Sequence, residues 1–348
     1  MQSTNYKKAG LLALIISFIA IASWEYSLRQ KGLTASYDDN EALWANKRAM
    51  VYEPSDKATV VIGSSRIKYD LDIPTWEGLT GNHVIQLANV GSSPRPVLED
   101  LANDKNFKGR LVIDVVEGIF FNPGAVFYDW RTNKKIAYYH TVTPTALFSF
   151  QVDRVLESQF VFLDQDNYSI NAMLDQLHIP NRTGQFSPVF PLEFARTSFA
   201  RQEYMMPQFV ADTNLQNQVK DVWVSFGRIN TTPPATGATL DSIINTVKAQ
   251  VNKIKSRGGD VVFVRPPSSG PAIMMEHKGF PRAAYWDRLL SMTGCQGIYF
   301  EDYPAIASFI CPEWSHLKPS DAVIYTRNLV KILSEEKGWS FHKNPTTL

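Results

Sequence analysis

Short apolar runs alternate with amphipathic stretches along most of the chain. Five of these runs are rich in Val and Ile, end at Gly, Asn, Pro or acidic residues, and therefore predict buried strands. The predicted strands are residues 59–62, 84–87, 111–116, 261–264 and 298–300, and the predicted helices are 94–103, 239–255 and 320–336. Runs without polar alternation favour a parallel sheet, because both faces of such a sheet are covered. The pattern predicts an α/β protein with a central parallel sheet, arranged as a three-layer α/β/α sandwich.

One long stretch, from about residue 127 to 237, breaks this rhythm. It is rich in aromatic residues, contains a helical stretch over 144–158, and ends in the turn-rich sequence NTTPPATGAT. We interpret it as an insertion between the third and fourth strands, serving as a lid or as a partner-binding surface.

The first 30 residues contain a candidate membrane segment. Two lysines at positions 7 and 8 precede an apolar run over residues 9–24. A spanning helix needs roughly 20 residues, and Trp24 and Tyr26 extend the run as interfacial aromatic residues. We therefore predict one transmembrane helix within residues 1–30, followed by a domain over residues 31–348.

Two other interpretations of this segment stay open. A cleavable signal peptide is the first, because Ala20-Ile21-Ala22 resembles a small-residue cleavage site. A buried helix of a soluble domain is the second. An anchor and a signal peptide both place the rest of the chain outside the cytoplasm, because the lysine pair stays inside.

Composition excludes several classes of protein. Of 348 residues, 44% are hydrophobic, which is enough for one large domain or two smaller ones and argues against disordered and fibrous classes. The formal net charge is only +1, so the cationic excess needed for a nucleic-acid partner is missing. Neither a CxxC nor an HExxH spacing occurs, and we expect no metal and no other cofactor.

The two cysteines, Cys295 and Cys311, both lie close to the C-terminal motif described next. In an exported protein they are able to form a disulfide worth roughly 3 kcal/mol in the chain-entropy model, which would hold the segment carrying His316. The other interpretation is two ordinary small buried residues.

Two short motifs far apart in the chain supply the candidate chemistry. GSSR at 63–66 follows the first predicted strand, and PEWSHLKP at 312–319 precedes the last predicted helix. A serine hydroxyl is a poor nucleophile unless an imidazole takes its proton during attack, and that imidazole needs a carboxylate at its other nitrogen. The motifs therefore predict a serine nucleophile in the first, with His316 as general base and Glu313 as the acid that orients it.

The order of the motifs resembles the SGNH (GDSL-like) hydrolase superfamily. In that family a G-D-S serine follows the first strand, a glycine follows the second, and a D-x-x-H pair precedes the last helix. Here Gly63-Ser64-Ser65 stands in the first place, which makes Ser65 the matching nucleophile. Asn89-Val90-Gly91 matches the second block, and Glu313-Trp314-Ser315-His316 matches the third with glutamate in place of aspartate. The likeness covers about residues 58–120 and 240–336 and implies a flavodoxin-like sheet.

An oxyanion also needs donors. Backbone N–H groups of Ser65, at a helix N-terminus, and of Gly91 are the candidates, with Asn89 as a further one. The family takes an asparagine from a G-x-N-D block, but residues 114–121 read DVVEGIFF and contain none. The sequence does not assign a role in the site to Glu117 or Asn122. Arg66 is interpreted either as a ligand for a substrate carboxylate or as a structural cap of the sheet edge.

These residues predict acyl transfer through a serine ester, to water or to another hydroxyl. The chain resembles membrane-anchored members that work beside membrane-bound O-acyltransferases in bacterial polysaccharide acylation. The resemblance implies an esterase or O-acetyltransferase acting on an exported or cell-envelope polysaccharide, with an acylated glycan or an acyl donor as substrate and a membrane-bound O-acyltransferase as candidate partner.

The resemblance also implies a location. It places the protein in the bacterial inner membrane as a single-pass protein with a periplasmic domain, or outside the cell after signal cleavage. A non-catalytic envelope protein of the same fold is the alternative function, binding a glycan or the membrane partner. The missing asparagine favours it, and so do the aromatic residues of the insertion, which suit sugar or protein contacts.

Overall fold

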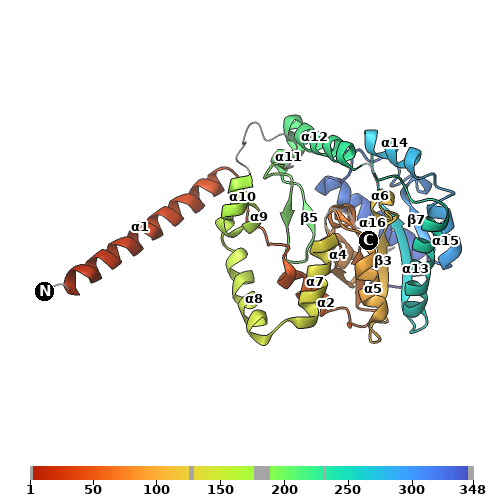
Figure 1. Cartoon of the computed structure of the whole chain (residues 1–348), viewed down its shortest axis with the longest axis horizontal. Helices are drawn as coiled ribbons and strands as arrows, with labels where there is room; N and C mark the ends of the chain where they lie inside the picture. The colour runs from red at the N-terminus through yellow and green to blue at the C-terminus, as the bar shows by residue number, and fades with distance from the viewer. Residues whose placement is uncertain (1–2, 125–128, 176–188, 231, 344–348) are drawn as a thin grey trace. The chain divides into compact units, whose positions relative to one another are not determined.

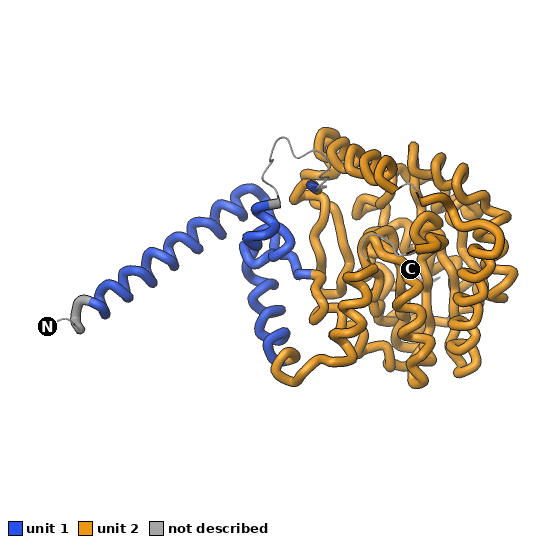
Figure 2. Tube along the Cα trace, in the orientation of Figure 1, with its two compact units in different colours: residues 1–38, 148–189 blue, residues 39–147, 190–348 orange. Residues whose placement is uncertain are grey.

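The computed structural model describes residues 3–124, 129–175, 189–230 and 232–343. The chain divides into two units (Figure 2), of which unit 1 comprises residues 1–38 and 148–189 and unit 2 comprises residues 39–147 and 190–348. The insertion predicted at about 127–237 is therefore shared between the two units. Its residues 127–128, 176–188 and 231 lie outside the described part of the chain.

Unit 2 is built on a five-stranded parallel sheet with the order β2-β1-β3-β6-β7 (Figure 1). The strands are β1 (Ala58–Ile62), β2 (His83–Gln86), β3 (Arg110–Asp114), β6 (Asp260–Arg265) and β7 (Gln296–Tyr299). Each of the five predicted strands is confirmed to within a few residues, as is the α/β class with a parallel sheet. A separate antiparallel pair, β4 (Arg196–Thr197) with β5 (Glu203–Tyr204), belongs to the same unit.

Strand β1, which has a neighbour on each side, shows why a run of apolar residues forms a parallel strand. All five residues of β1 are buried, and β1 pairs with β2 on one edge and β3 on the other. Burying a Val or Ile side chain contributes roughly 1.5–3 kcal/mol, which a strand with one solvent-exposed face would forfeit at every second residue. Continuous apolar runs therefore select the interior of a covered sheet.

Helices of unit 2 pack in two groups that follow their apolar stripes. In α13 (Gly237–Lys255) the buried positions Leu240, Ile244, Val247 and Val251 recur at helical spacing. This helix contacts α5 (Arg95–Asn103) and α15 (Trp286–Thr293). The other group places α16 (Pro319–Glu335) against α3 (Ser65–Asp70) and α4 (Ile73–Thr80).

Unit 2 contains further helices, several of them short. They are α2 (Glu41–Arg48), α6 (Glu117–Phe120), α7 (Asp129–Thr141), α11 (Pro207–Ala211), α12 (Thr213–Ile229), α14 (Gly270–Gly279) and the 3-10 turn η2 (Phe300–Asp302). Cys295 and Cys311 are free thiols, so of the two interpretations of the cysteines the unbridged one describes this structure.

Unit 1 holds the predicted N-terminal apolar helix, α1 (Ser3–Gln30). Residues Tyr6–Gln30 form a helix long and apolar enough to cross a membrane, and its side chains are almost all exposed. This exposure does not fit a buried helix of a soluble domain. A signal sequence has the same length and composition, so the choice between anchor and cleaved signal stays a prediction. Unit 1 also contains η1 (Val161–Leu163), α9 (Gln165–Tyr168), α10 (Ile170–Asp175) and most of α8 (Pro144–Glu157).

Two carboxyl groups share a buried site in unit 1. Asp38 and Glu157 are both buried and hydrogen-bonded to each other. Loss of solvation raises the pKa of Asp38 to about 8 and the pKa of Glu157 to about 7. The unfolded chain releases these protons near pH 4. Between about pH 4 and pH 8 the folded unit therefore binds more protons, and its stability falls as the pH rises.

We predict that Asp38→Asn flattens this pH dependence, because the variant carries no charge to desolvate at that position. Hydrogen exchange of the α8 amides in the full chain, corrected for the intrinsic rate at each pH, should show less additional opening from pH 5.5 to pH 8 than in the wild type. Asp56→Asn removes an exposed carboxyl in unit 2 and is the matched control. Equal pH dependence in Asp38→Asn and the wild type would contradict the burial argument.

Candidate active site

Ser65 is the first residue of α3, directly after β1, and the turn before it is fixed by close backbone packing. A Cβ added to Gly63 would lie 2.4 Å from the Asp114 Cβ at the end of β3, so only glycine fits there. The Ser64 amide and hydroxyl donate to Asp114 Oδ2 at 2.9 and 3.0 Å. Burial raises the pKa of Asp114 to about 6. Ser64 is thus a structural residue, and Ser65 is the serine that is partly exposed.

The structure brings Ser65, His316 and Glu313 together in one hydrogen-bonded chain. His316 Nε2 lies 2.9 Å from Ser65 Oγ, and its Nδ1 lies 3.0 Å from Glu313 Oε1. Because an ionised carboxylate only accepts, the imidazole proton belongs on Nδ1, and Nε2 is left to accept from the serine hydroxyl. Burial alone would raise the pKa of Glu313, but His316 and the other donors hold it below its ordinary value.

A strained loop shapes the acid side of this chain. Trp314 has φ +79°, in the left-handed region that non-glycine residues rarely adopt, and such a conformation costs roughly 1–3 kcal/mol. The turn lets Glu313 Oε1 accept from the amides of Ser315 and His316 at 3.3 and 2.6 Å as well as from the imidazole. The extra methylene of glutamate is accommodated because the loop folds back onto its own carboxylate.

The insertion supplies a fourth partner that sequence reasoning missed. Trp223, on α12, donates its indole N–H to Glu313 Oε2 at 2.5 Å. The centroid of the Trp223 ring lies 6.0 Å from that of His316, and the centroid of the Tyr69 ring lies 4.5 Å from that of His316. The apolar positions 219, 222, 223 and 226 recur at helical spacing, which predicts a buried helix face. Nothing in the spacing says which carboxylate the helix covers.

A cavity of about 360 Å³ opens beside Ser65 and His316. It is lined by segments that follow β1, β2 and β3, including Val90, Gly91, Val116 and Ile119, and by the aromatic side chains Phe190, Trp223 and Phe226. The connection after β1 leads to β2 at one edge of the sheet, and the connection after β3 leads to β6 on the other side. Connections that run in opposite directions from two adjacent strands leave a crevice at the carboxyl ends of those strands. Ligands of open α/β sheets bind at such a point, and the volume suits a small organic ligand.

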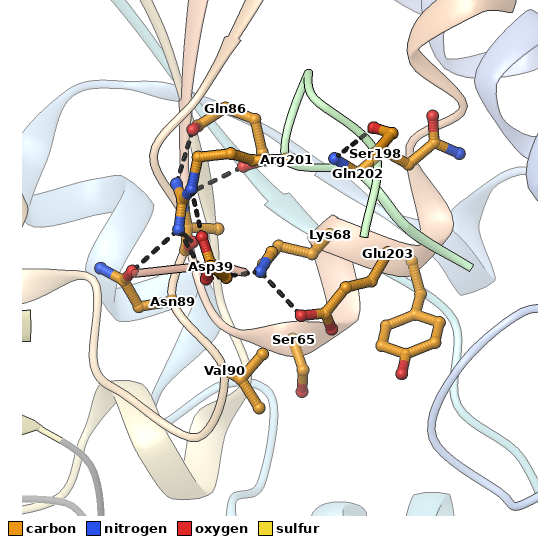
Figure 3. A network of polar contacts seen from close by, with 12 residues as sticks. Asp39, Ser65, Lys68, Gln86, Asn89, Val90, Ser198, Arg201, Gln202 and Glu203 are labelled. Carbon is orange, nitrogen blue, oxygen red and sulfur yellow. Dashed lines mark hydrogen bonds and ion pairs between the residues drawn. The ribbon is translucent and has the colours of Figure 1, made fainter. Parts of the chain in front are cut away.

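The predicted oxyanion donors behave differently from one another. Ser65 and Gly91 both line the cavity, Gly91 has φ +60°, and neither backbone amide donates to another described residue. Asn89 is not among the residues that line the cavity. Its side chain points toward Arg201 and away from Ser65 (Figure 3), with its Oδ1 accepting from Arg201 and Lys135 at 3.1 Å each. The geometry therefore supports two backbone donors and not the Asn89 side chain.

Arg66 and Glu117 belong to a buried ion-pair chain. Arg66 Nη2 donates to Glu276 Oε1 at 2.7 Å, and Glu276 also accepts from Arg265 and from Ser268 Oγ. Arg265 pairs with Glu117 at 3.1 Å. Burial alone would raise the pKa of Glu276, but Arg66 and Arg265 lower it to about 2. Arg66 thus has a structural partner, while Asn122 closes its own turn by accepting from the Gly124 amide.

Behind the nucleophile lies a second buried cluster, centred on Asp39 (Figure 3). Arg201 Nε donates to Asp39 Oδ1 at 2.5 Å, while Lys68 and Lys135 donate to Oδ2 at 2.9 Å. Burial alone would raise the pKa of Asp39, but the three cations hold it well below its ordinary value. Lys68 also donates to Glu203 at 2.8 Å, so three positive charges face two negative ones. Lys68 is on α3, three residues after Ser65.

Arg201 connects this cluster to the loop that carries Gly91. Its guanidinium donates to the carbonyl oxygens of Gln86 and Ala88 at 2.7 and 3.0 Å. These two residues end β2 and begin the loop. Arg201 itself has φ +65°, a further strained position in the β4–β5 connection. A fully buried fork therefore fixes the path of the loop before it reaches the cavity.

We predict that Arg201→Leu destabilises the protein by about 3–5 kcal/mol, because Asp39 loses its two-pronged partner while the buried carbonyl groups of Gln86 and Ala88 lose their donor. Denaturant unfolding of the full chain in detergent measures this. Arg201→Lys keeps the charge but loses the planar guanidinium. Its free energy of unfolding should lie between those of the wild type and Arg201→Leu. Arg282→Leu removes an exposed ion pair to Asp302 and should cost at most about 1 kcal/mol. Equal losses for the Leu variants at 201 and 282 would contradict a central role for the buried fork.

Comparison with known proteins adds no identity. The chain matches no family model and no curated protein. Among the described residues, no group of three or more His, Cys, Asp or Glu side chains is placed to hold a metal ion. The arrangement of Ser65, His316 and Glu313 beside a cavity is therefore the observation on which a functional conclusion has to rest.

Proposed function

We propose that this protein is a serine-dependent acyl-ester hydrolase or O-acyltransferase of the SGNH type. The observation that carries the proposal is the hydrogen-bonded chain Ser65–His316–Glu313 at the edge of a cavity. The proposed substrate is an ester, most simply an O-acetyl ester, of an exported or cell-envelope polysaccharide. An acylated glycan or an acyl donor occupies the cavity with its carbonyl carbon next to Ser65 Oγ.

The finer fold belongs to the same proposal. Renumbered along the sheet, the strand order β2-β1-β3-β6-β7 is 2-1-3-4-5, the flavodoxin-like order. The two helix groups, α5–α13–α15 and α3–α4–α16, supply candidates for the two outer layers of a three-layer sandwich. Both features support an SGNH-like architecture, because that family places its serine after the first strand of such a sheet.

In the proposed first half-reaction, Ser65 Oγ attacks the ester carbonyl while His316 Nε2 takes the hydroxyl proton. Glu313 stabilises the imidazolium through Nδ1 and stays ionised. The carbonyl oxygen becomes an oxyanion that the Ser65 and Gly91 amides are placed to receive. As the tetrahedral intermediate collapses, its bond to the alcohol oxygen breaks, and His316 returns the proton to that oxygen. The acyl group is then an ester of Ser65.

The second half-reaction runs the same steps with a new hydroxyl. Water or a sugar hydroxyl loses its proton to His316, attacks the Ser65 ester, and releases the serine with the proton returned to Oγ. Water gives hydrolysis, and a sugar hydroxyl gives O-acyl transfer. The apolar and aromatic wall formed by Phe190, Trp223 and Phe226 limits the entry of water and offers flat faces for a sugar ring.

The proposal includes a location, which α1 supports, and a partner, which the resemblance to membrane-anchored SGNH proteins implies. The apolar helix supports a single-pass anchor in a bacterial inner membrane, with the lysine pair inside and the domain in the periplasm. A secreted form after signal cleavage is the alternative. A membrane-bound O-acyltransferase that passes acyl groups to Ser65 is the proposed partner.

A non-catalytic binding protein is the second candidate function. The specific observation that favours it is the missing third oxyanion donor, since residues 114–121 contain no asparagine and Asn89 is not among the residues that line the cavity. The loss of one such donor costs roughly a hundredfold or more in rate. In this function the aromatic wall would bind a glycan without turnover.

The first test is labelling of the full chain in detergent with a fluorophosphonate, read by intact mass. We predict one adduct in the wild type, none in Ser65→Ala or His316→Ala, and labelling slowed by roughly a hundredfold or more in Glu313→Gln. Ser64→Ala is the matched control and should keep the adduct. A folded wild-type protein that takes no label would refute the activated serine and favour the binding function.

Trp223→Phe tests the contribution of the insertion. The variant keeps an aromatic ring in the cavity wall but removes the donor to Glu313 Oε2. A hydrogen bond to a charged group contributes about 1.5–3 kcal/mol, so the labelling rate should fall by about tenfold or more. Phe226→Leu alters the same wall without touching the carboxylate and should change the rate much less. Similar labelling rates for the two variants would show that Trp223 only lines the cavity and that its hydrogen bond to Glu313 does not affect Ser65.

A further inference from the structure

Unit 1 exposes an unusual amount of apolar surface outside α1. On α8, Phe148, Val152, Val155 and Leu156 are 72%, 45%, 56% and 41% exposed. With 100° per residue these four side chains fall within an arc of about 100°. The opposite face of the helix carries Phe150 and Glu157, which are buried. The helix therefore exposes its apolar face to solvent, whereas a helix that packs on a protein core buries that face.

A second helix of the unit repeats the pattern. On α10, Ile170, Met173 and Leu174 are 78%, 49% and 54% exposed and share one face by their spacing. Phe160, between α8 and η1, is 39% exposed. Exposed apolar surface of this kind marks a site that another apolar phase covers.

The contacts of this segment with α1 indicate which phase that is. The rings of Phe162 and Tyr168 each lie 5.8 Å from Trp24, and Glu25 accepts from the Val161 and Phe162 amides at 3.1 Å. The Arg29 guanidinium donates to the Gln159 carbonyl at 2.6 Å. The segment is thus bonded to the last turns of α1, and Figure 2 shows it gathered at that end of the helix.

The length of α1 sets the level of these last turns. The 25 residues of Tyr6–Gln30 extend roughly 37 Å as a helix, against roughly 30 Å for the hydrocarbon core of a bilayer. If α1 spans, its end from Trp24 onward lies in the headgroup region, where Trp and Tyr are favoured. The bonded segment then lies at the same level, with its apolar side chains facing the lipid.

We propose that α8, η1 and α10 form an interfacial face that rests on the lipid surface from which α1 emerges. The side chains of Phe148, Val152 and Val155 insert at the boundary of headgroups and acyl chains. Residues 148–175 contain five acidic residues and one basic residue, so the face is held by apolar burial and not by attraction to anionic lipid. It fixes how unit 1 rests on the membrane, and it does not depend on the proposed chemistry.

The test uses the full chain reconstituted in phosphatidylcholine vesicles that contain a photoreactive phospholipid. One probe carries the carbene precursor near the headgroup and a second carries it near the chain end; adducts are mapped by peptide mass. Interfacial helices insert only about 5–10 Å. We expect residues 148–174 to react mainly with the first probe, about tenfold above the peptides of α12, and α1 to react with both.

Substitution gives the matched control. The triple change Phe148→Ser, Val152→Ser and Val155→Ser should abolish the adducts on α8 and leave those on α1, because it removes the three apolar side chains proposed to insert into the lipid. Ile310→Ser with Ile324→Ser removes exposed apolar residues of unit 2 and should change neither. Replacing part of the lipid by phosphatidylglycerol should not increase the yield on residues 148–174.

Two outcomes overturn the proposal. Adducts on α1 with only background on residues 148–174 would show that lipid does not cover this face, and would favour a membrane protein as its partner. Adducts on neither segment would show that α1 does not span, and the proposal would fall with it. In both cases the labelling of Ser65 by a fluorophosphonate remains a separate question with its own result.

Discussion

The largely buried Asp39 carboxylate, whose side chain is only 13% exposed, is the constraint on which the candidate site depends. Three cations from three separate elements bind it, namely Lys68 on α3, Lys135 on α7 and Arg201 in the β4–β5 connection. A charge buried in this way is costly unless every partner is present, so folding has to bring all of these elements together. The position of the Ser65 helix and the path of the Gly91 loop follow from that requirement.

The same logic explains why strain is tolerated in two places. Trp314 and Arg201 are the non-glycine residues with positive φ in the described chain, and each sits in a loop that fixes a polar group of the site. The Trp314 turn wraps the Glu313 carboxylate, and the Arg201 turn aims a guanidinium at the end of β2. Strain of roughly 1–3 kcal/mol at each is offset by hydrogen bonds to buried charges.

Most strands of the sheet could be predicted from the sequence, because a buried strand is indicated by residues that are adjacent in the chain. In runs such as the one ending at Ile62, each apolar residue by itself indicates a buried position. The order of the motifs predicted Ser65, Glu313 and His316 as site residues. The contacts of Asp39, Arg201 and Trp223 could not be predicted from the sequence. Each joins positions far apart in the chain, and a lone charge or indole looks the same in sequence whether it is buried against a partner or solvated. Asn89 illustrates this limit: Gly91, two residues further on, lines the cavity, while Asn89 Oδ1 accepts from Arg201.

Trp223 links α12, in the predicted insertion, to the proposed chemistry. Its ring lines the cavity and its N–H fixes the carboxylate that orients His316. A ligand that presses on the ring therefore acts on the same side chain that holds Glu313. Under the proposed mechanism, occupancy of the cavity and the orientation of the base are coupled through one residue. An acceptor held against this wall lies beside the base that activates it, and such positioning favours its reaction over that of water from the bulk.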